Sequence, residues 1–137
     1  MNLSNLSNLS NLSFIKPIFL FSILLVLIDL IWLIGGSSLH QRNFTNIQKE
    51  PLKFRRLPAI LFYLMAGITF YILVYSEQNK QMYIIKAIMF GLLAYATFDL
   101  TNLALFKDYS WSYAILDTIW GIVAITITAF LVHKITK

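Results

Sequence analysis

Three aspartates stand inside apolar stretches of the sequence, and their carboxylates are the groups best suited to chemistry. Asp29, Asp99 and Asp117 each lie in a run that is otherwise apolar enough to sit in a lipid bilayer. An aspartate near the middle of a membrane helix costs roughly 2.5–3.5 kcal/mol, so three cost on the order of 8–10 kcal/mol. A small membrane protein has little reason to retain such groups unless they bind something, and a buried carboxylate is suited to a proton or a cation.

Aromatic and amide residues accompany these aspartates at helical spacing. Two segments share one pattern, Asp29–Trp32 (DLIW) and Asp117–Trp120 (DTIW), whereas Asp99 has Tyr95 four residues before it. Residues three or four apart share a helix face, and an indole beside a carboxylate can hold a cation through its ring face. We therefore predict a pocket lined by Trp32, Tyr95, Asn102 and Trp120, with proton or cation binding by Asp29, Asp99 and Asp117.

Buried polar residues also have a purely structural interpretation. Aspartate and asparagine side chains can hold membrane helices together through interhelical hydrogen bonds, which contribute on average less than ~1 kcal/mol each. That contribution is too small to offset three insertion costs of the size given above. We favour a binding site because three aspartates occur together, each with a polar or aromatic neighbour on its face.

The composition indicates an integral membrane protein. The 137 residues are 58% hydrophobic and 12% charged, with a mean hydropathy of +0.72, whereas soluble domains carry about 25% charged residues. No cysteine is present, which excludes disulfides, cysteine metal sites and a cysteine nucleophile. We predict an all-α fold, a four-helix transmembrane bundle within residues 14–137, with spans at about 17–36, 58–75, 87–106 and 112–132.

The remaining segments are predicted to be connections and an extension. Residues 1–13 contain Asn-Leu-Ser repeated four times and are expected to be a disordered, low-complexity extension. A polar loop from about His40 to Leu57 should join the first two spans, with His40 and His133 solvated at helix ends and not binding metal. Gly67, Gly91 and Gly121 are expected to be close-packing points.

The charge of +5 arises mainly from short segments beside the spans, where basic residues meet lipid head groups rather than nucleic acid. Six Lys or Arg fall in the first and third connections and five on the opposite side, a small excess that places the termini outside. We expect the protein in the plasma (inner) membrane.

The four spans predict a common depth for the polar residues. Counted inward from the side of the first and third connections, the aspartates and their partners lie four to eight residues deep, roughly 6–12 Å. The first and fourth spans run in opposite directions, so Asp29 should lie level with Trp120 and Asp117 level with Trp32. Because lipid does not accept carboxylates, all three aspartates are expected to face one inner chamber. Poor solvation there favours a carboxyl group that carries a proton near neutral pH.

Several runs resemble a known family. The segment Tyr95–Ala104 (YATFDLTNLA) followed by Asp117–Gly121 (DTIWG) is similar to the predicted bacterial membrane proteins grouped as domain of unknown function 2177. Asp29–Leu33 and Pro58–Tyr63 resemble it as well, and the resemblance extends from about Ile15 to the C-terminus. It implies four membrane helices and brings no established activity.

Three classes of function fit these features to different degrees. The first is a small proton-linked transporter or exchanger for a cation or an amine, working as a homodimer because four short helices enclose little volume. The second is a membrane assembly or binding subunit whose buried polar layer recognises partner helices. The third is an intramembrane enzyme with paired carboxylates. Because the sequence offers no nucleophile, metal set or phosphate-binding loop, we expect no enzyme activity and no cofactor.

Overall fold

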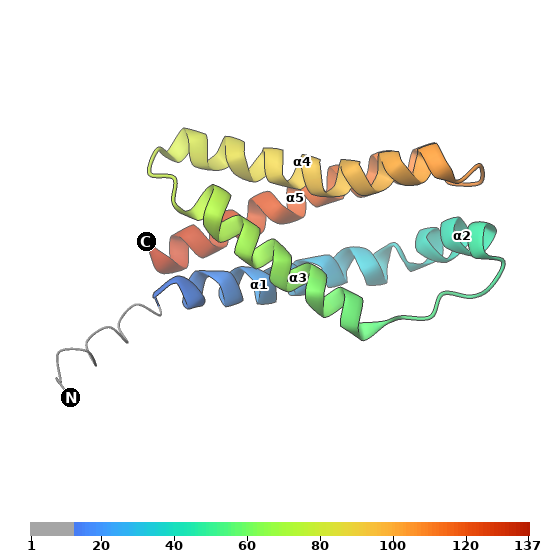
Figure 1. Cartoon of the computed structure of the whole chain (residues 1–137), viewed down its shortest axis with the longest axis horizontal. Coiled ribbons are helices and arrows are strands. Elements are labelled where there is room, and N and C mark those ends of the chain that lie inside the picture. The colour runs from blue at the N-terminus through green and yellow to red at the C-terminus, as the bar shows by residue number, and fades with distance from the viewer. Residues whose placement is uncertain (1–12) are drawn as a thin grey trace, which may run out of the picture.

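The computed structural model describes residues 13–137, and every regular element in that range is helical. The elements in chain order are α1 (Ile15–Gly35), α2 (Ser37–Gln48), α3 (Arg56–Phe70), the π-helical turn η3 (Tyr71–Tyr75), α4 (Lys80–Leu105) and α5 (Trp111–Thr136). Four helices of 20–26 residues, with α3 and η3 counted as one, are long and apolar enough to cross a membrane (Figure 1). The predicted four-span fold is confirmed. The predicted extension lies outside the described residues apart from Ser13.

The ends of the spanning helices follow from local chemistry. Pro17 and Pro58 stand in the first turns of α1 and α3, where a missing backbone N–H costs nothing. The Asn79 side chain accepts hydrogen bonds from the backbone N–H groups of residues 81 and 82, at 3.0 and 3.1 Å, and so caps α4. Because of this cap, the third span begins at Lys80, seven residues before the predicted start at Ala87.

The predicted polar loop from His40 to Leu57 is wrong over its first part, which forms α2. Two polar residues of α2, His40 and Asn43, are buried, with Phe44 and Ile47 partly buried on the same face. These positions follow the i, i+3, i+4, i+7 spacing of one helix face. They pack against the short connection between α4 and α5 and against the start of α5, so α2 covers that end of the bundle.

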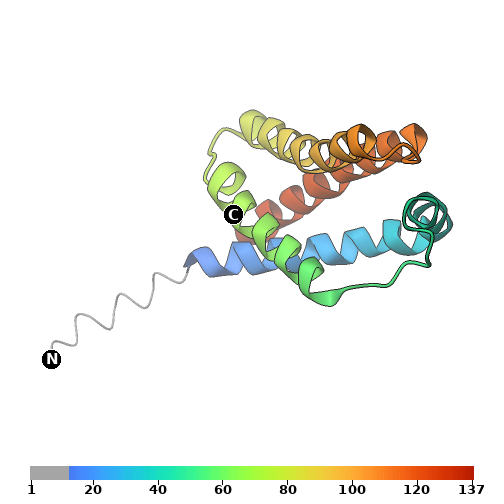
Figure 2. The ribbon, with the colours of Figure 1, turned by 45° about the vertical axis from the view of Figure 1, so that its right-hand side comes forward.

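The helices form two packed layers that meet along α5. α4 lies along α5, and α1 packs against both α3 and α5 (Figure 1). α3 crosses α1 obliquely, so that its η3 end lies near the start of α4 while its beginning lies away from α4 (Figure 2). The result is a seam between α3 and α4 that widens toward α2.

The apolar core occupies the half of the bundle nearest the chain termini. The Phe21 and Phe70 rings stack there with centroids 4.1 Å apart. Other side chains in this region are fully buried as well: Leu25, Val74, Ala124, Ile125, Ala129 and Val132. The three aspartates lie toward the other half of the bundle. Hydrogen bonds hold the helices together there, whereas apolar packing does so near the termini.

Glycine permits the closest helix contacts, as expected for Gly67, Gly91 and Gly121. A Cβ atom added at Gly91 would lie 2.7 Å from the Ile122 Cα and 2.8 Å from the Gly121 carbonyl oxygen. One added at Gly67 would lie 2.6 Å from the Ile18 carbonyl oxygen. α4 therefore meets α5, and α3 meets α1, backbone against backbone.

Gly91→Ala should destabilise the protein, because the added methyl group has to separate α4 from α5. We expect a loss of about 1–3 kcal/mol, as is typical of overpacking, measured as a lower melting temperature in detergent micelles. Gly35→Ala is the matched control, since nothing lies within 4 Å of a Cβ atom at that position. Equal melting temperatures for the two variants would contradict the close approach of α4 to α5.

Candidate functional site

Two aspartate–tryptophan pairs cross between α1 and α5. The Trp32 indole N–H on α1 donates to Asp117 Oδ1 on α5 at 2.6 Å, and the Trp120 indole N–H on α5 donates to Asp29 Oδ1 on α1 at 2.9 Å. The two indoles stack on each other, with ring centroids 5.7 Å apart and planes 16° apart. The depths predicted from the D-x-x-W segments are thus confirmed, since each acid lies level with the indole of the antiparallel helix.

Asp29 is the point where all four spanning helices meet. Its buried carboxylate accepts hydrogen bonds from Trp120 on α5, from the Tyr95 hydroxyl on α4 at 3.0 Å, and from the Tyr63 hydroxyl on α3 at 3.2 Å. Tyr95 reaches this position because Gly121 has no side chain, and a Cβ atom there would collide with the Tyr95 ring. Three donors from three helices thus converge on a single carboxylate and reach both of its oxygens.

Asp117 is less completely satisfied than Asp29. It is buried, and Trp32 donates to its Oδ1, but no donor within residues 13–137 reaches its Oδ2. The side chain lines a cavity of about 650 Å³ together with Asp29, Trp32 and Tyr95. Most of the other lining residues are aromatic or aliphatic: Leu33, His40, Phe44, Leu52, Phe62, Ala94, Thr97, Phe98 and Tyr113. The cavity is therefore lined by an incompletely hydrogen-bonded carboxylate within largely aromatic walls.

Asp99 does not join the other two aspartates in this cavity. It is buried between α4 and α5, where the Tyr109 hydroxyl and the Thr118 hydroxyl each donate to it at 2.8 Å. Asp99 lines a separate, smaller cavity of about 220 Å³, so the single chamber predicted for three carboxylates is wrong. The physical reason is the short connection 106–110, which folds Tyr109 back onto Asp99 and closes the α4–α5 hairpin over it. Burial and the hydrogen bond to Asp99 raise the pKa of Tyr109, so its hydroxyl keeps the proton that it donates.

The predicted pocket-lining residues divide in the same way. Trp32 and Tyr95 line the large cavity. Trp120 is hydrogen-bonded to Asp29 but does not line this cavity. Asn102 is half-buried and lines neither the large cavity nor the smaller one at Asp99. The assigned roles in proton and cation binding remain predictions for all of these residues.

His40 is buried, and the prediction that solvent surrounds it is wrong. Its Nδ1 lies 2.8 Å from the Tyr113 hydroxyl, and its Nε2 lies 3.2 Å from the Trp32 carbonyl oxygen. A carbonyl oxygen only accepts, so Nε2 carries a hydrogen and donates it, while Nδ1 is hydrogen-bonded to the Tyr113 hydroxyl. α2 places His40 there by folding back onto the ends of α1 and α5. His133 is half-buried too, with its ring 4.8 Å from that of Tyr83. Among residues 13–137, no three His, Asp or Glu side chains gather as a metal centre.

These features define a multi-pass membrane protein whose spanning helices meet at a buried cluster of carboxylates, indoles and phenols. The model of a family described as predicted membrane protein (DUF2177) matches residues 14–133. The chain therefore belongs to this family, in agreement with the resemblance of its D-L-T-N and D-x-x-W-G runs. No curated protein and no solved structure gives a significant match to the chain.

Trp32→Phe should destabilise the fold, because it removes the only donor to the Asp117 carboxylate within the described residues. An unsatisfied buried polar group costs about 1–3 kcal/mol, which thermal unfolding in detergent would measure. Trp111→Phe is the matched control, since the Trp111 side chain is 68% exposed. A double-mutant cycle with Asp117→Asn should give a coupling of about 0.5–3 kcal/mol. Strictly additive effects would show that the indole and the carboxylate do not interact.

The ring nitrogens of His40 should report its buried hydrogen bonds. We expect nitrogen NMR of the protein in micelles to show the His40 ring protonated at Nε2, with the Nδ1 signal changing in Tyr113→Phe. His133 provides an internal reference, identified through His133→Gln, and its signal should not respond to Tyr113→Phe. A His40 ring protonated only at Nδ1 would contradict the bond to the Trp32 carbonyl oxygen.

Proposed function

We propose that this protein binds an organic cation or amine in the large cavity and carries it across the membrane in exchange for a proton. The observation that supports this most strongly is Asp117, which lines an aromatic-walled cavity and whose Oδ2 has no donor within the described residues. A cation is stabilised by a carboxylate and by the faces of aromatic rings, and a carboxylate that releases a cation can take up a proton. No covalent step is involved.

The size of the cavity fits a small organic ligand. Its volume of about 650 Å³ falls within the range of roughly 300–1,000 Å³ of small-molecule sites. This open cavity is lined by residues of one chain, so the binding of a ligand does not require a second copy. A homodimer remains part of the proposal only for the movement of the helices during transport.

A neighbouring cavity supports a ligand with an apolar part. A second cavity, of about 640 Å³, lies along the seam between α3 and α4 and shares Ala94 and Thr97 with the first. The seam faces the lipid, because its residues Ile72, Leu73 and Leu93 are exposed on the surface of the bundle. An amphiphilic amine could enter sideways from the bilayer and bring its charged end to Asp117.

The proposal gives the three aspartates different tasks. Asp117 contacts the cation and exchanges it for a proton. Asp29, with three donors of its own, shapes the site and holds the helices around it. Asp99 stays a candidate proton-binding residue outside the cavity, close to the connection between α4 and α5.

Uptake of a quaternary ammonium or a lipophilic amine into proteoliposomes under a pH gradient tests this function. Asp117→Asn should lower the flux at least about tenfold, which corresponds to about 1.4 kcal/mol of lost interaction. Asp108→Asn is the control, because Asp108 is exposed and forms a surface salt bridge with Lys49 at 3.8 Å. Wild-type flux in Asp117→Asn, with several cations tested, would rule out the proposed mechanism.

The exposed seam between α3 and α4 also favours a second candidate, a membrane assembly subunit that receives a partner helix there. In that case the buried aspartates serve the fold and the contact. Asp117→Asn would then be mild and Asp117→Leu severe, and the loss would appear as failure to recover the complex after mild solubilisation. Flux would be absent from the wild-type protein.

A further inference from the structure

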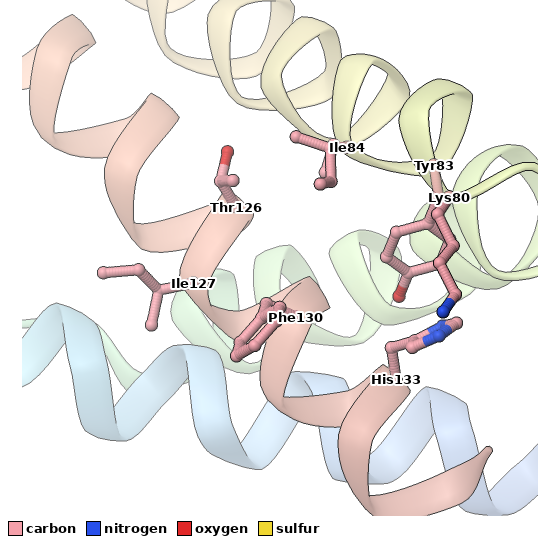
Figure 3. Close-up of a pocket in the computed structure, with 8 residues that line it drawn as sticks. Lys80, Tyr83, Ile84, Thr126, Ile127, Phe130 and His133 are labelled. Carbon is pink, nitrogen blue, oxygen red and sulfur yellow. The ribbon is translucent and has the colours of Figure 1, made fainter.

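We propose that the groove between α4 and α5 near the chain terminus binds an anionic phospholipid. The groove has a volume of about 390 Å³ and lies at the opposite end of α4 and α5 from Asp99. It shares no residue with the proposed cation cavity, so the two proposals stand or fall separately. Its lining residues include Lys80, Tyr83, Ile84, Thr126, Ile127 and His133 (Figure 3).

The groove has a polar end and an apolar end. Figure 3 shows Lys80 and His133 next to each other at one end, whereas Ile84 and Ile127 lie toward the other. From Lys80 to Ala87 the helix advances seven residues, about 10 Å at 1.5 Å per residue. The apolar core of a bilayer is about 30 Å thick, so this length extends from the head groups across most of the apolar part of one leaflet. A phosphate at the mouth would therefore place an acyl chain along the isoleucines.

Two polar atoms in this groove lack partners within the described part of the chain. His133 Nδ1 and Thr126 Oγ1 are both buried, and neither makes a hydrogen bond. The hydroxyl of Tyr83, by contrast, donates to the Ala129 carbonyl oxygen at 2.8 Å. Buried polar groups are nearly always paired. Once neighbouring side chains move aside, a lipid phosphate at the mouth would accept from His133 Nδ1, and a lipid glycerol or ester oxygen would accept from the Thr126 hydroxyl.

The local charge selects an anionic ligand. Glu77 is the only acidic side chain among the residues of this end of the bundle, and it pairs with Lys86 at 2.7 Å. The Lys86 ammonium and the Asn79 backbone N–H lower the pKa of Glu77 from its ordinary value of 4.5, so this acid is ionised and already engaged. Lys80 has no salt-bridge partner in the described chain. Its ammonium is therefore free to meet a phosphate where the membrane surface begins.

Native mass spectrometry of the full-length chain would test this site. The protein is reconstituted with equal amounts of phosphatidylglycerol and phosphatidylcholine of identical acyl chains, and the lipid that stays bound on release is identified. We expect one phosphatidylglycerol per chain, retained about fivefold more often than phosphatidylcholine, as one basic residue at a membrane surface would provide. Lys80→Ala should reduce this retention about fivefold. Lys107→Ala, an exposed lysine at the opposite end, is the matched control and should leave it unchanged.

A second variant tests the groove apart from its charge. Ile127→Trp fills the apolar end without altering a basic residue, and the Ile127 side chain is exposed enough to tolerate the change. Retention of phosphatidylglycerol should fall in this variant as well. Equal retention of both lipids, or equal losses in Lys80→Ala and Lys107→Ala, would overturn the proposal. Full displacement of phosphatidylglycerol by inorganic phosphate, together with no effect of Ile127→Trp, would also overturn it. The same holds if a dimer of the chain appears in place of the complex with lipid.

Discussion

The hydrogen bonds to the Asp29 carboxylate are the interaction on which the polar half of this bundle depends. Lipid offers no hydrogen bonds, so a buried carboxylate has to be satisfied by the protein or by what fills an adjoining cavity. Tyr63, Tyr95 and Trp120 provide the donors, each from a different spanning helix. A group that is costly to insert thereby becomes the one that fixes the relative positions of α1, α3, α4 and α5. The absence of a side chain at Gly121 follows from the same requirement, because the Tyr95 ring occupies that space.

The bundle uses different physics at its two ends. Near the termini, phenylalanine and small residues pack tightly, as the stacked rings of Phe21 and Phe70 show. Toward α2, the interior of the bundle consists of phenols, indoles and carboxylates, and α3 diverges from α4. Side chains that point at a shared hydrogen-bonding centre do not fill space as evenly as apolar ones do. The large cavity lies in that half, with Asp117 on its wall.

The spans and the crossed pairs could be predicted from the sequence, but the surroundings of the aspartates could not. Four apolar runs and two D-x-x-W segments are local signals, and antiparallel geometry turns them into matched depths. α2 was not predicted, because two positions on its buried face are His40 and Asn43, and these polar residues mask the apolar periodicity of an amphipathic helix. The separate position of Asp99 depends on Tyr109, a residue of the connection whose direction no spacing rule specifies. Nothing in the sequence distinguishes Tyr63 from other residues of an apolar helix. Its contact with Asp29 depends on how α1 and α3 cross.

The stacked indoles of Trp32 and Trp120 have a mechanical consequence. Each ring donates its N–H group to the acid of the opposite helix while its face rests on the other ring. Both bonds run between α1 and α5, so a shift of one helix along the other acts on both bonds at the same time. A displacement of α1 against α5 therefore strains both acid–indole bonds together, whereas Asp29 keeps its tyrosine donors from α3 and α4.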